Sequence, residues 1–288
     1  MGVKIKRWVM KVRALYVIVA VLVVVGLVVG ASYHYARLRV SPPSPTLTST
    51  SSALPEVTLI SVYDNYQVRS DLKASWGFAT VIKTPKDTIL FDTGGSSEIL
   101  LFNMEKLGID PLSIKKVVIS HVHGDHVGGL EGFLERNSNV TVFIPASFPQ
   151  SIKDMIVNKG AELVEVSGPM EISDSVYSTG ELYGPPVEQA LIIDSEKGLI
   201  VITGCAHPGI VKIVKKAKEL LGKEVYLVVG GFHHPPVSVV EEFRELGVKK
   251  VAPSHCTGDR VREAFKEEYK EDFIEYGVGK IIEIKSDC

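Results

Sequence analysis

The sequence predicts an α/β (α+β) domain with two sheets enclosed between helices, preceded by one N-terminal transmembrane helix and a linker. Three observations predict this organisation. Residues 14–32 are uncharged and apolar, Ser, Thr and Pro make up twelve of the fifteen residues 41–55, and strand and helix patterns alternate from residue 56 onward. At 288 residues, the chain is long enough for one sizeable domain with these extensions.

The apolar stretch has the length of a membrane-spanning helix. Its nineteen residues would extend about 28 Å as a helix, close to the roughly 30 Å hydrocarbon core of a bilayer. Residues 1–13 contain five Lys or Arg and no acid, so the positive-inside bias predicts a cytoplasmic basic flank. We therefore expect a single-pass anchor over residues 14–36 in the cell membrane, with the catalytic domain outside. A signal peptide cleaved near the small residues 30–32 is the alternative.

Residues 37–55 are the predicted linker. A Ser/Thr/Pro-rich segment has too little apolar surface to offset its chain entropy, so we expect it to stay extended. It would hold the domain of residues 56–288 away from the membrane.

Charge and cysteine content exclude two classes of protein. Of the 32 Lys and Arg, seven lie in the first forty residues, which leaves 25 against all 34 Asp and Glu and a formal charge of −9. Phosphate neutralisation needs a basic surface, so we expect no nucleic-acid partner. Three cysteines are too few for a disulfide framework, and Cys205 and Cys256 lie beside histidines, which favours a role in a site.

The elements of the domain follow from periodicity and from turn residues. Short, β-branched runs predict strands at residues 57–60, 79–83, 88–91, 116–120, 140–144, 163–166, 189–193, 199–203, 225–230, 250–253 and 280–284. Helices are predicted at residues 96–107, beyond residue 129, and at 148–158, 209–221, 237–246 and 260–273. Gly108 ends the first helix, and Ile210, Ile213 and Val214 share one face of another. Residues 170–186 are predicted to be loops.

The most informative stretch is Ser120-His121-Val122-His123-Gly124-Asp125-His126-Val127-Gly128-Gly129. It follows the buried strand predicted at 116–120, at the end of a strand where open α/β sheets usually bind ligands. Imidazole and carboxylate groups at this spacing suit a divalent ion such as zinc. His121 and His123 could bind one ion, and Asp125 and His126 a second.

The remaining histidines repeat this placement. One of the eight, His34, lies just beyond the apolar stretch of residues 14–32. All seven in the predicted domain follow a predicted strand closely, with Gly or Pro nearby: His121, His123, His126, His207, His233, His234 and His255. Histidines with unrelated structural roles would also occur within helices. Their common position predicts one metal site built from several strand ends.

Four segments carry a resemblance to a known family. They are Thr88-Ile89-Leu90-Phe91-Asp92-Thr93-Gly94, Thr203-Gly204-Cys205-Ala206-His207-Pro208-Gly209, Gly230-Gly231-Phe232-His233 and Pro253-Ser254-His255-Cys256-Thr257-Gly258. Together with the histidine cluster, they make the chain similar to the metallo-β-lactamase superfamily from about residue 57 onward. The branch it resembles is that of the 7,8-dihydropterin-6-methyl-4-(β-D-ribofuranosyl)aminobenzene-5′-phosphate synthase-like metallo-hydrolases. The resemblance implies a four-layer αββα sandwich.

The resemblance to this family implies that the predicted metal ligands divide into two sets. We assign His121, His123 and His207 to one metal and Asp125, His126 and His255 to the other. The expected cofactor is one or two divalent metal ions, with zinc the favoured metal. Many members carry a bridging aspartate where this chain has Cys205. Its thiolate could replace that ligand, or Cys205 could be a small buried residue, and both alternatives stay open.

Further roles are expected around the ligands. Asp125 is a candidate catalytic group as well as a ligand, and His233 is expected to contact substrate or metal. Asp92 is expected to orient the ligands through hydrogen bonds. The pair Asp64-Asn65 resembles a segment near the substrate in the same branch. His234 is expected to be a neighbour of the site, and Cys256 a packing residue.

The function expected from these residues is a membrane-tethered, metal-dependent hydrolase. A metal-activated water would attack an ester, phosphoester or related bond of a small-molecule substrate. Two alternatives stay open: the condensation of a dihydropterin with a ribofuranosylaminobenzene phosphate, and a non-catalytic, metal-stabilised binding domain. The synthase conflicts with the predicted export, because its metabolites belong to the cytoplasm.

Overall fold

The computed structural model describes residues 56–285. The predicted basic flank, transmembrane anchor and linker fall on residues 1–55 and lie outside the described residues, as do residues 286–288. No helix within residues 56–285 combines the length and the apolar character needed to cross a bilayer.

The first sheet has seven strands in the order β13-β1-β2-β3-β4-β5-β6. Their bounds are β1 Val57–Tyr63, β2 Ala79–Lys83, β3 Thr88–Phe91, β4 Lys116–Val118, β5 Thr141–Pro145, β6 Glu162–Val166 and β13 Ile281–Ile284. Strands β3 to β6 pair in parallel, whereas β13, β1, β2 and β3 pair antiparallel.

The second sheet has six strands in the order β12-β11-β10-β9-β8-β7. Their bounds are β7 Met170–Ser173, β8 Val176–Ser178, β9 Leu191–Ser195, β10 Gly198–Thr203, β11 Val225–Gly231 and β12 Lys250–Ser254. Strands β10, β11 and β12 pair in parallel, and β7 to β10 pair antiparallel.

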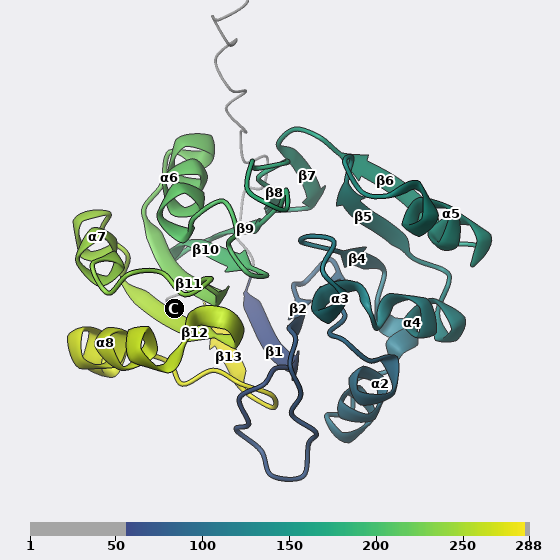
Figure 1. The fold of residues 1–288 in the computed structure, drawn as a ribbon, viewed down its shortest axis with the longest axis horizontal. Helices are drawn as coiled ribbons and strands as arrows, with labels where there is room; N and C mark the ends of the chain where they lie inside the picture. The colour runs from purple at the N-terminus through teal and green to yellow at the C-terminus, as the bar shows by residue number, and fades with distance from the viewer. Residues whose placement is uncertain (1–55, 286–288) are drawn as a thin grey trace, which may run out of the picture. The chain divides into compact units, whose positions relative to one another are not determined.

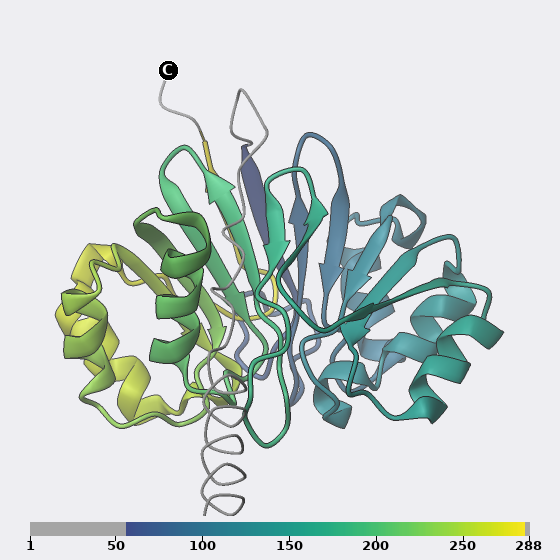
Figure 2. The ribbon, with the colours of Figure 1, turned by 90° about the horizontal axis from the view of Figure 1, so that it is seen from above.

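Helices cover the outer face of each sheet (Figures 1 and 2). Helices α2 Ser97–Lys106, α4 Leu130–Arg136 and α5 Gln150–Asn158 pack on the first sheet. Helices α6 Ile210–Leu221, α7 Val239–Glu245 and α8 Asp259–Tyr269 pack on the second. A third apolar cluster, which includes Phe91, Val118, Ile202 and Val229, lies between the sheets. The predicted sandwich of two sheets between helices is therefore confirmed.

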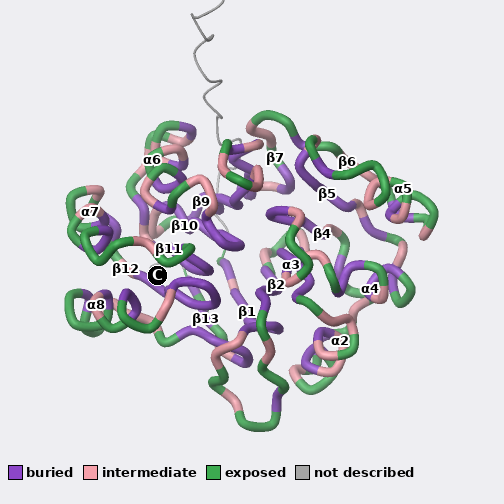
Figure 3. The backbone as a smooth tube through the Cα atoms, viewed as in Figure 1, coloured by how far each residue is buried: buried purple, intermediate pink, exposed green. Residues whose placement is uncertain are grey.

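The sequence pattern explains these layers. Most strand residues are buried on both faces, as the near-continuous β-branched runs predict, while the outer helices expose one side (Figure 3). In α6, the buried residues recur at helical spacing: Ile210, Ile213, Val214, Ala217 and Leu220. Short 3₁₀ turns complete the fold at η1 Pro111–Ser113, η2 His255–Thr257 and η3 Lys270–Asp272.

The structure corrects the sequence prediction in two places. Part of the segment 170–186, predicted as loops, forms the hairpin of β7 and β8. β7 has four residues and β8 three, too few to show a period. The hairpin is stabilised by the pairing of β8 with β9 and by Ile172 and Val176 in the core between the sheets. In addition, Asp125 and His126 lie on the short helix α3 Gly124–Val127 and not on a loop.

The topology of the two sheets brings the carboxyl ends of several strands close together. Asp92 directly follows β3, and Ser120 and His121 follow β4, its parallel neighbour in the first sheet. In the second sheet, segments after the parallel strands β10, β11 and β12 carry Cys205, His233 and His255. The carboxyl ends of parallel strands from both sheets therefore meet at one place, where a site is expected.

Candidate metal centre

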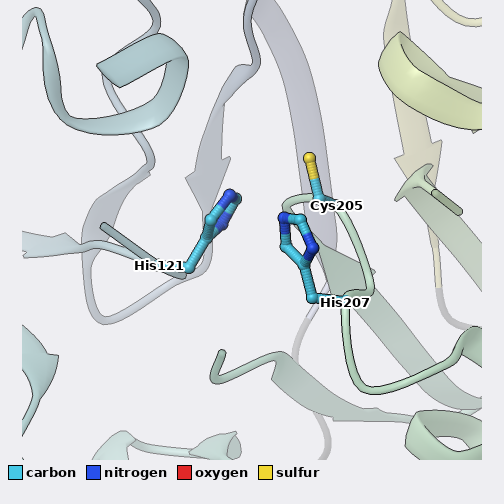
Figure 4. Close-up of side chains that lie close together, drawn as sticks. All are labelled: His121, Cys205 and His207. Atoms are coloured by element: carbon cyan, nitrogen blue, oxygen red, sulfur yellow. The ribbon is translucent and has the colours of Figure 1, made fainter. Parts of the chain in front are cut away.

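The first predicted ligand set is brought together by the two sheets. The ring centroids of His121, His123 and His207 lie 4.8 Å, 4.7 Å and 4.8 Å from one another. His121 comes from the segment after β4, while His207 comes from the segment after β10, next to Cys205 (Figure 4). His121 is buried, His207 is half-buried and His123 is exposed, so the set opens toward solvent on one side.

The second predicted set is also assembled. Nε2 of His126 lies 3.2 Å from Nε2 of His255. An oxygen of Asp125, Oδ2, lies 3.3 Å from Nε2 of His255 and 3.6 Å from Nε2 of His126. Both histidines are buried and Asp125 is half-buried.

Cys205 lies between the two sets. Its Sγ is 3.2 Å from Nε2 of His126. Within 4.8 Å, potential ligand atoms of Cys205 group with those of His121 and His207, and also with those of His126 and His255. The side chain thus occupies the position from which one thiolate could reach ions in both sets, which favours the ligand interpretation over mere packing.

Each buried histidine is held through Nδ1 and presents Nε2 to the centre. Nδ1 of His121 lies 2.9 Å from Oγ of Ser120, Nδ1 of His126 lies 2.7 Å from Oδ2 of Asp92, and Nδ1 of His255 lies 2.9 Å from Oδ1 of Asn65. Such partners fix the ring and the tautomer of metal-binding histidines. Asn65, predicted to lie near substrate, therefore orients the candidate ligand His255.

Two buried nitrogens in the centre lack hydrogen-bond partners among the described residues. They are Nε2 of His121 and Nε2 of His207. Leaving such atoms unpaired costs about 1–3 kcal/mol each, and buried polar atoms in native proteins are rarely left so. Both histidines group with the Cys205 thiol within 4.8 Å, and zinc accepts imidazole and thiolate ligands, so these three side chains fit a divalent metal.

The backbone around the centre adopts strained conformations. Five non-glycine residues of the site have positive φ: Asp92, Ala206, His233, His234 and His255. Only two others, Ser175 and Lys270, do so in the described part of the chain. Left-handed conformations cost about 1–3 kcal/mol at residues with a Cβ and concentrate at functional sites. The strain therefore marks the same place as the ligands.

The charge state of the histidines suits ligand roles. Burial, followed by repulsion from His126 and His207, lowers the pKa of His121 far below its usual range. Burial and the neighbouring His233 lower the pKa of His207 to about 4. Both rings are therefore neutral at pH 7, with a lone pair free to bind a cation. Burial lowers the pKa of His126, but the Asp92 carboxylate outweighs it and the net shift is upward.

The two candidate catalytic groups flank the sets. Burial raises the pKa of Asp125, but the hydrogen bond from His255 and the charge of His126 outweigh it, so that the net shift is downward. The ring of His233 lies 4.1 Å from that of His207 and is exposed. Burial of part of the ring and the nearby His234 lower the pKa of His233. Asp125 is thus an anion and His233 a neutral base at pH 7.

One important residue was not predicted from sequence. The buried Glu188 accepts hydrogen bonds from the backbone N–H groups of Cys205 and Ala206, both at 2.9 Å, and of His207 at 2.8 Å. Burial raises its pKa, although these three donors oppose the shift. Glu188 therefore sets the path of the loop that carries two predicted ligands.

Comparisons with known proteins show which family and which relatives the chain resembles. A model of the family described as the metallo-beta-lactamase superfamily matches residues 77–248. The 7,8-dihydropterin-6-methyl-4-(beta-D-ribofuranosyl)-aminobenzene-5'-phosphate synthase of Methanocaldococcus jannaschii is 34% identical over 248 residues, which cover 68% of this chain and 84% of that enzyme. The ribonuclease Z of Pediococcus pentosaceus is 38% identical over 165 residues, but these cover only 44% of its length and 55% of this chain.

Solved structures show the same fold. The crystal structure of a metal-dependent hydrolase of the beta-lactamase superfamily matches with a TM-score of 0.68 and 26% identity, over 80% of this chain and 100% of the other.

Proposed function

The chain belongs to the metallo-beta-lactamase superfamily, and on this basis we propose that it is a metal-dependent hydrolase of an ester, a phosphoester or a related bond. The observation that carries the proposal is that Cys205 lies close to histidines of both predicted ligand sets. In addition, Nε2 of His121 and Nε2 of His207 are buried there without a hydrogen-bond partner among the described residues. The similarity to a solved metal-dependent hydrolase supports it.

Two divalent ions, with zinc favoured, would be held by seven residues: His121, His123 and His207 in one set, Asp125, His126 and His255 in the other, and Cys205 between them. Bound at this place, they would lower the pKa of water and polarise a substrate oxygen. The neighbouring Cys256, followed by burial, raises the pKa of the Cys205 thiol, so the thiolate depends on a nearby cation.

Two side chains of the protein would accept the proton and bind the substrate. Asp125 is anionic and half-buried, so it can accept a proton at the mouth of the centre. His233 is neutral, exposed and next to His207, so its ring N–H can hydrogen-bond a substrate oxygen. We propose a small-molecule substrate and not a nucleic acid, because the chain beyond residue 40 has a formal charge of −9.

The test is hydrolysis by the purified full chain, stripped with chelator and reloaded with zinc. Substrates would be p-nitrophenyl acetate, p-nitrophenyl phosphate, bis(p-nitrophenyl) phosphate and an RNA hairpin. Replacing both His121 and His123 with Ala should abolish zinc binding and turnover, whereas His234→Ala, a neighbouring exposed histidine, should retain both. Undiminished turnover in the chelated protein would end the proposal.

We further propose that the domain is tethered outside the cytoplasm. The support is the apolar stretch within residues 14–36, the basic residues before it and the polar linker after it. Protease added to intact cells should then cleave the domain, and permeabilisation should make little difference. Protection until permeabilisation would contradict the proposal.

A second candidate is a synthase-type condensation. It is favoured by the 34% identity to the M. jannaschii enzyme over most of that enzyme's length. The test is to incubate the zinc-loaded chain with a ribofuranosylaminobenzene phosphate and a dihydropterin that carries a diphosphate on its 6-hydroxymethyl group, so that diphosphate leaves as the new bond forms, and to analyse products by mass spectrometry. A condensed product without any hydrolysis of the substrates above, together with a protected domain, would make this candidate the leading one.

A further inference from the structure

Exposed aromatic side chains are rare on the described surface. Within residues 56–285, only Trp76 and Tyr183 expose more than a third of their area among aromatic residues, at 54% and 86%. Single exposed apolar residues are ordinary on protein surfaces and need no explanation. What distinguishes these two is their place.

Both border the candidate metal centre, on different sides. The ring centroid of Trp76 lies 4.9 Å from that of His255, in the second ligand set. Tyr183 precedes Gly184, where a Cβ would come within 2.8 Å of backbone atoms of His207, in the first set. Trp76 belongs to the loop between β1 and β2 of one sheet, and Tyr183 to the loop between β8 and β9 of the other.

The backbone on either side of each aromatic residue is fixed. Next to Trp76, Ser75 N–H donates to the carbonyl of Asp64 at 3.1 Å, and Phe78 N–H donates to the carbonyl of Asp125 at 3.2 Å. Tight packing at Gly77, where a Cβ would lie 2.5 Å from the same Asp125 oxygen, keeps the loop against the metal-binding segment.

The loop of Tyr183 is held in a similar way. Leu182 and Glu188 exchange two backbone hydrogen bonds, of 2.9 Å and 3.2 Å, and so close the loop at its base. Nζ of Lys212 donates to the carbonyl of Tyr183 at 3.1 Å. Since Glu188 also binds the backbone of the ligand loop, Tyr183 and His207 are positioned by the same residue.

We infer that Trp76 and Tyr183 form the walls of the substrate site and bind a planar aromatic or heteroaromatic ring by stacking. This inference rests on the proposed function and adds the class of substrate to it. Two aromatic side chains on fixed backbone, one in a loop beside each ligand set, can hold a flat ring while its ester or phosphoester group reaches the metal centre. Stacking on aromatic side chains tolerates many ring types and favours flat over saturated rings.

The test compares two non-hydrolysable probes that differ only in their ring: phenylphosphonate and cyclohexylphosphonate. Binding to the zinc-loaded full chain is measured by calorimetry, so the result does not depend on turnover. The wild-type protein should bind the flat ring more tightly. Trp76→Leu and Tyr183→Leu should each weaken phenylphosphonate binding about 3- to 10-fold and leave cyclohexylphosphonate binding nearly unchanged.

Trp76→Phe and Tyr183→Phe are the matched controls, and both should keep the preference for the flat ring. Zinc content is measured for every variant, so that loss of metal is not mistaken for loss of stacking. Equal affinity of the wild type for both probes, or Leu variants that bind phenylphosphonate as the wild type does, would overturn the inference. A ring preference without any hydrolysis would instead leave it standing while the proposed hydrolase fails.

Discussion

Oδ2 of Asp92 lies 2.7 Å from Nδ1 of His126, and both side chains are fully buried. The same carboxylate accepts hydrogen bonds from the backbone N–H and from Oγ of Ser120, each at 2.7 Å. Ser120 in turn contacts Nδ1 of His121. Asp92 therefore orients one histidine of each ligand set, directly in one case and through Ser120 in the other.

Replacing Asp92 with Asn should weaken metal binding by about 10- to 100-fold, the usual cost of losing a partner that orients metal ligands. The amide cannot serve the histidine and both Ser120 donors as acceptors at once. Competition with a chelator of known affinity measures the change. Asp87→Asn, the same substitution at an ion pair with Lys116, is the control and should leave zinc affinity unchanged. Equal affinities in both variants would refute this role of Asp92.

Glu188→Gln should destabilise the protein by about 1–3 kcal/mol, because the Gln amide group brings N–H donors to a place where three backbone donors converge. Urea denaturation of the metal-free protein measures the free energy of unfolding. The control is Glu162→Gln, in which an exposed carboxylate that bonds Thr141 is changed in the same way. Indistinguishable unfolding midpoints for the two variants would count against the role given to Glu188.

Cys205→Ser should reduce the metal content toward one ion per chain, while Cys205→Asp, which restores a carboxylate, should retain two. Cobalt-loaded wild type should show a thiolate-to-cobalt absorption band that Cys205→Ser abolishes. Cys256→Ser is the matched control and should keep the band. A band that survives in Cys205→Ser would assign Cys205 to packing.

Asp64 predicts a pH dependence of stability in the metal-free protein. Burial raises the pKa of this carboxyl from its ordinary value of 3.8 to about 7. A raised folded-state pKa contributes stability that is present below about pH 4 and is lost as the pH rises through 7, at up to roughly 1.4 kcal/mol per pH unit. Asp64→Asn should remove this component, so that the variant gains stability relative to wild type between pH 5 and pH 8. Parallel pH profiles in urea denaturation would contradict it.

Parts of the site were predictable because their signal is local. His121, His123, Asp125 and His126 lie within six consecutive positions, and the strand before them is apolar and β-branched. The distant candidate ligands His207 and His255 are predicted by the family motifs, and the structure brings both to the cluster. Periodicity predicted most individual strands and helices, while the family resemblance implied their arrangement as a four-layer αββα sandwich.

Other features depend on tertiary contacts and leave no local signal. Glu188 follows a run of Gly and Pro and resembles an ordinary surface acid, yet it is buried beneath a loop about twenty residues away in sequence. Nothing in the sequence near Trp76 or Tyr183 predicts a role in substrate binding. Their role is inferred from their positions in the fold, close to His255 and to the backbone of His207. The strands β7 and β8 are too short for periodicity to detect.

The measurement that tests the central claim most directly is metal content by mass spectrometry on the purified full chain, compared with the variant in which His121 and His123 are both Ala. The account predicts about two zinc ions per wild-type chain and a clear loss of bound zinc in the variant. A wild-type protein that binds no divalent metal, or a variant that keeps both ions, would contradict it.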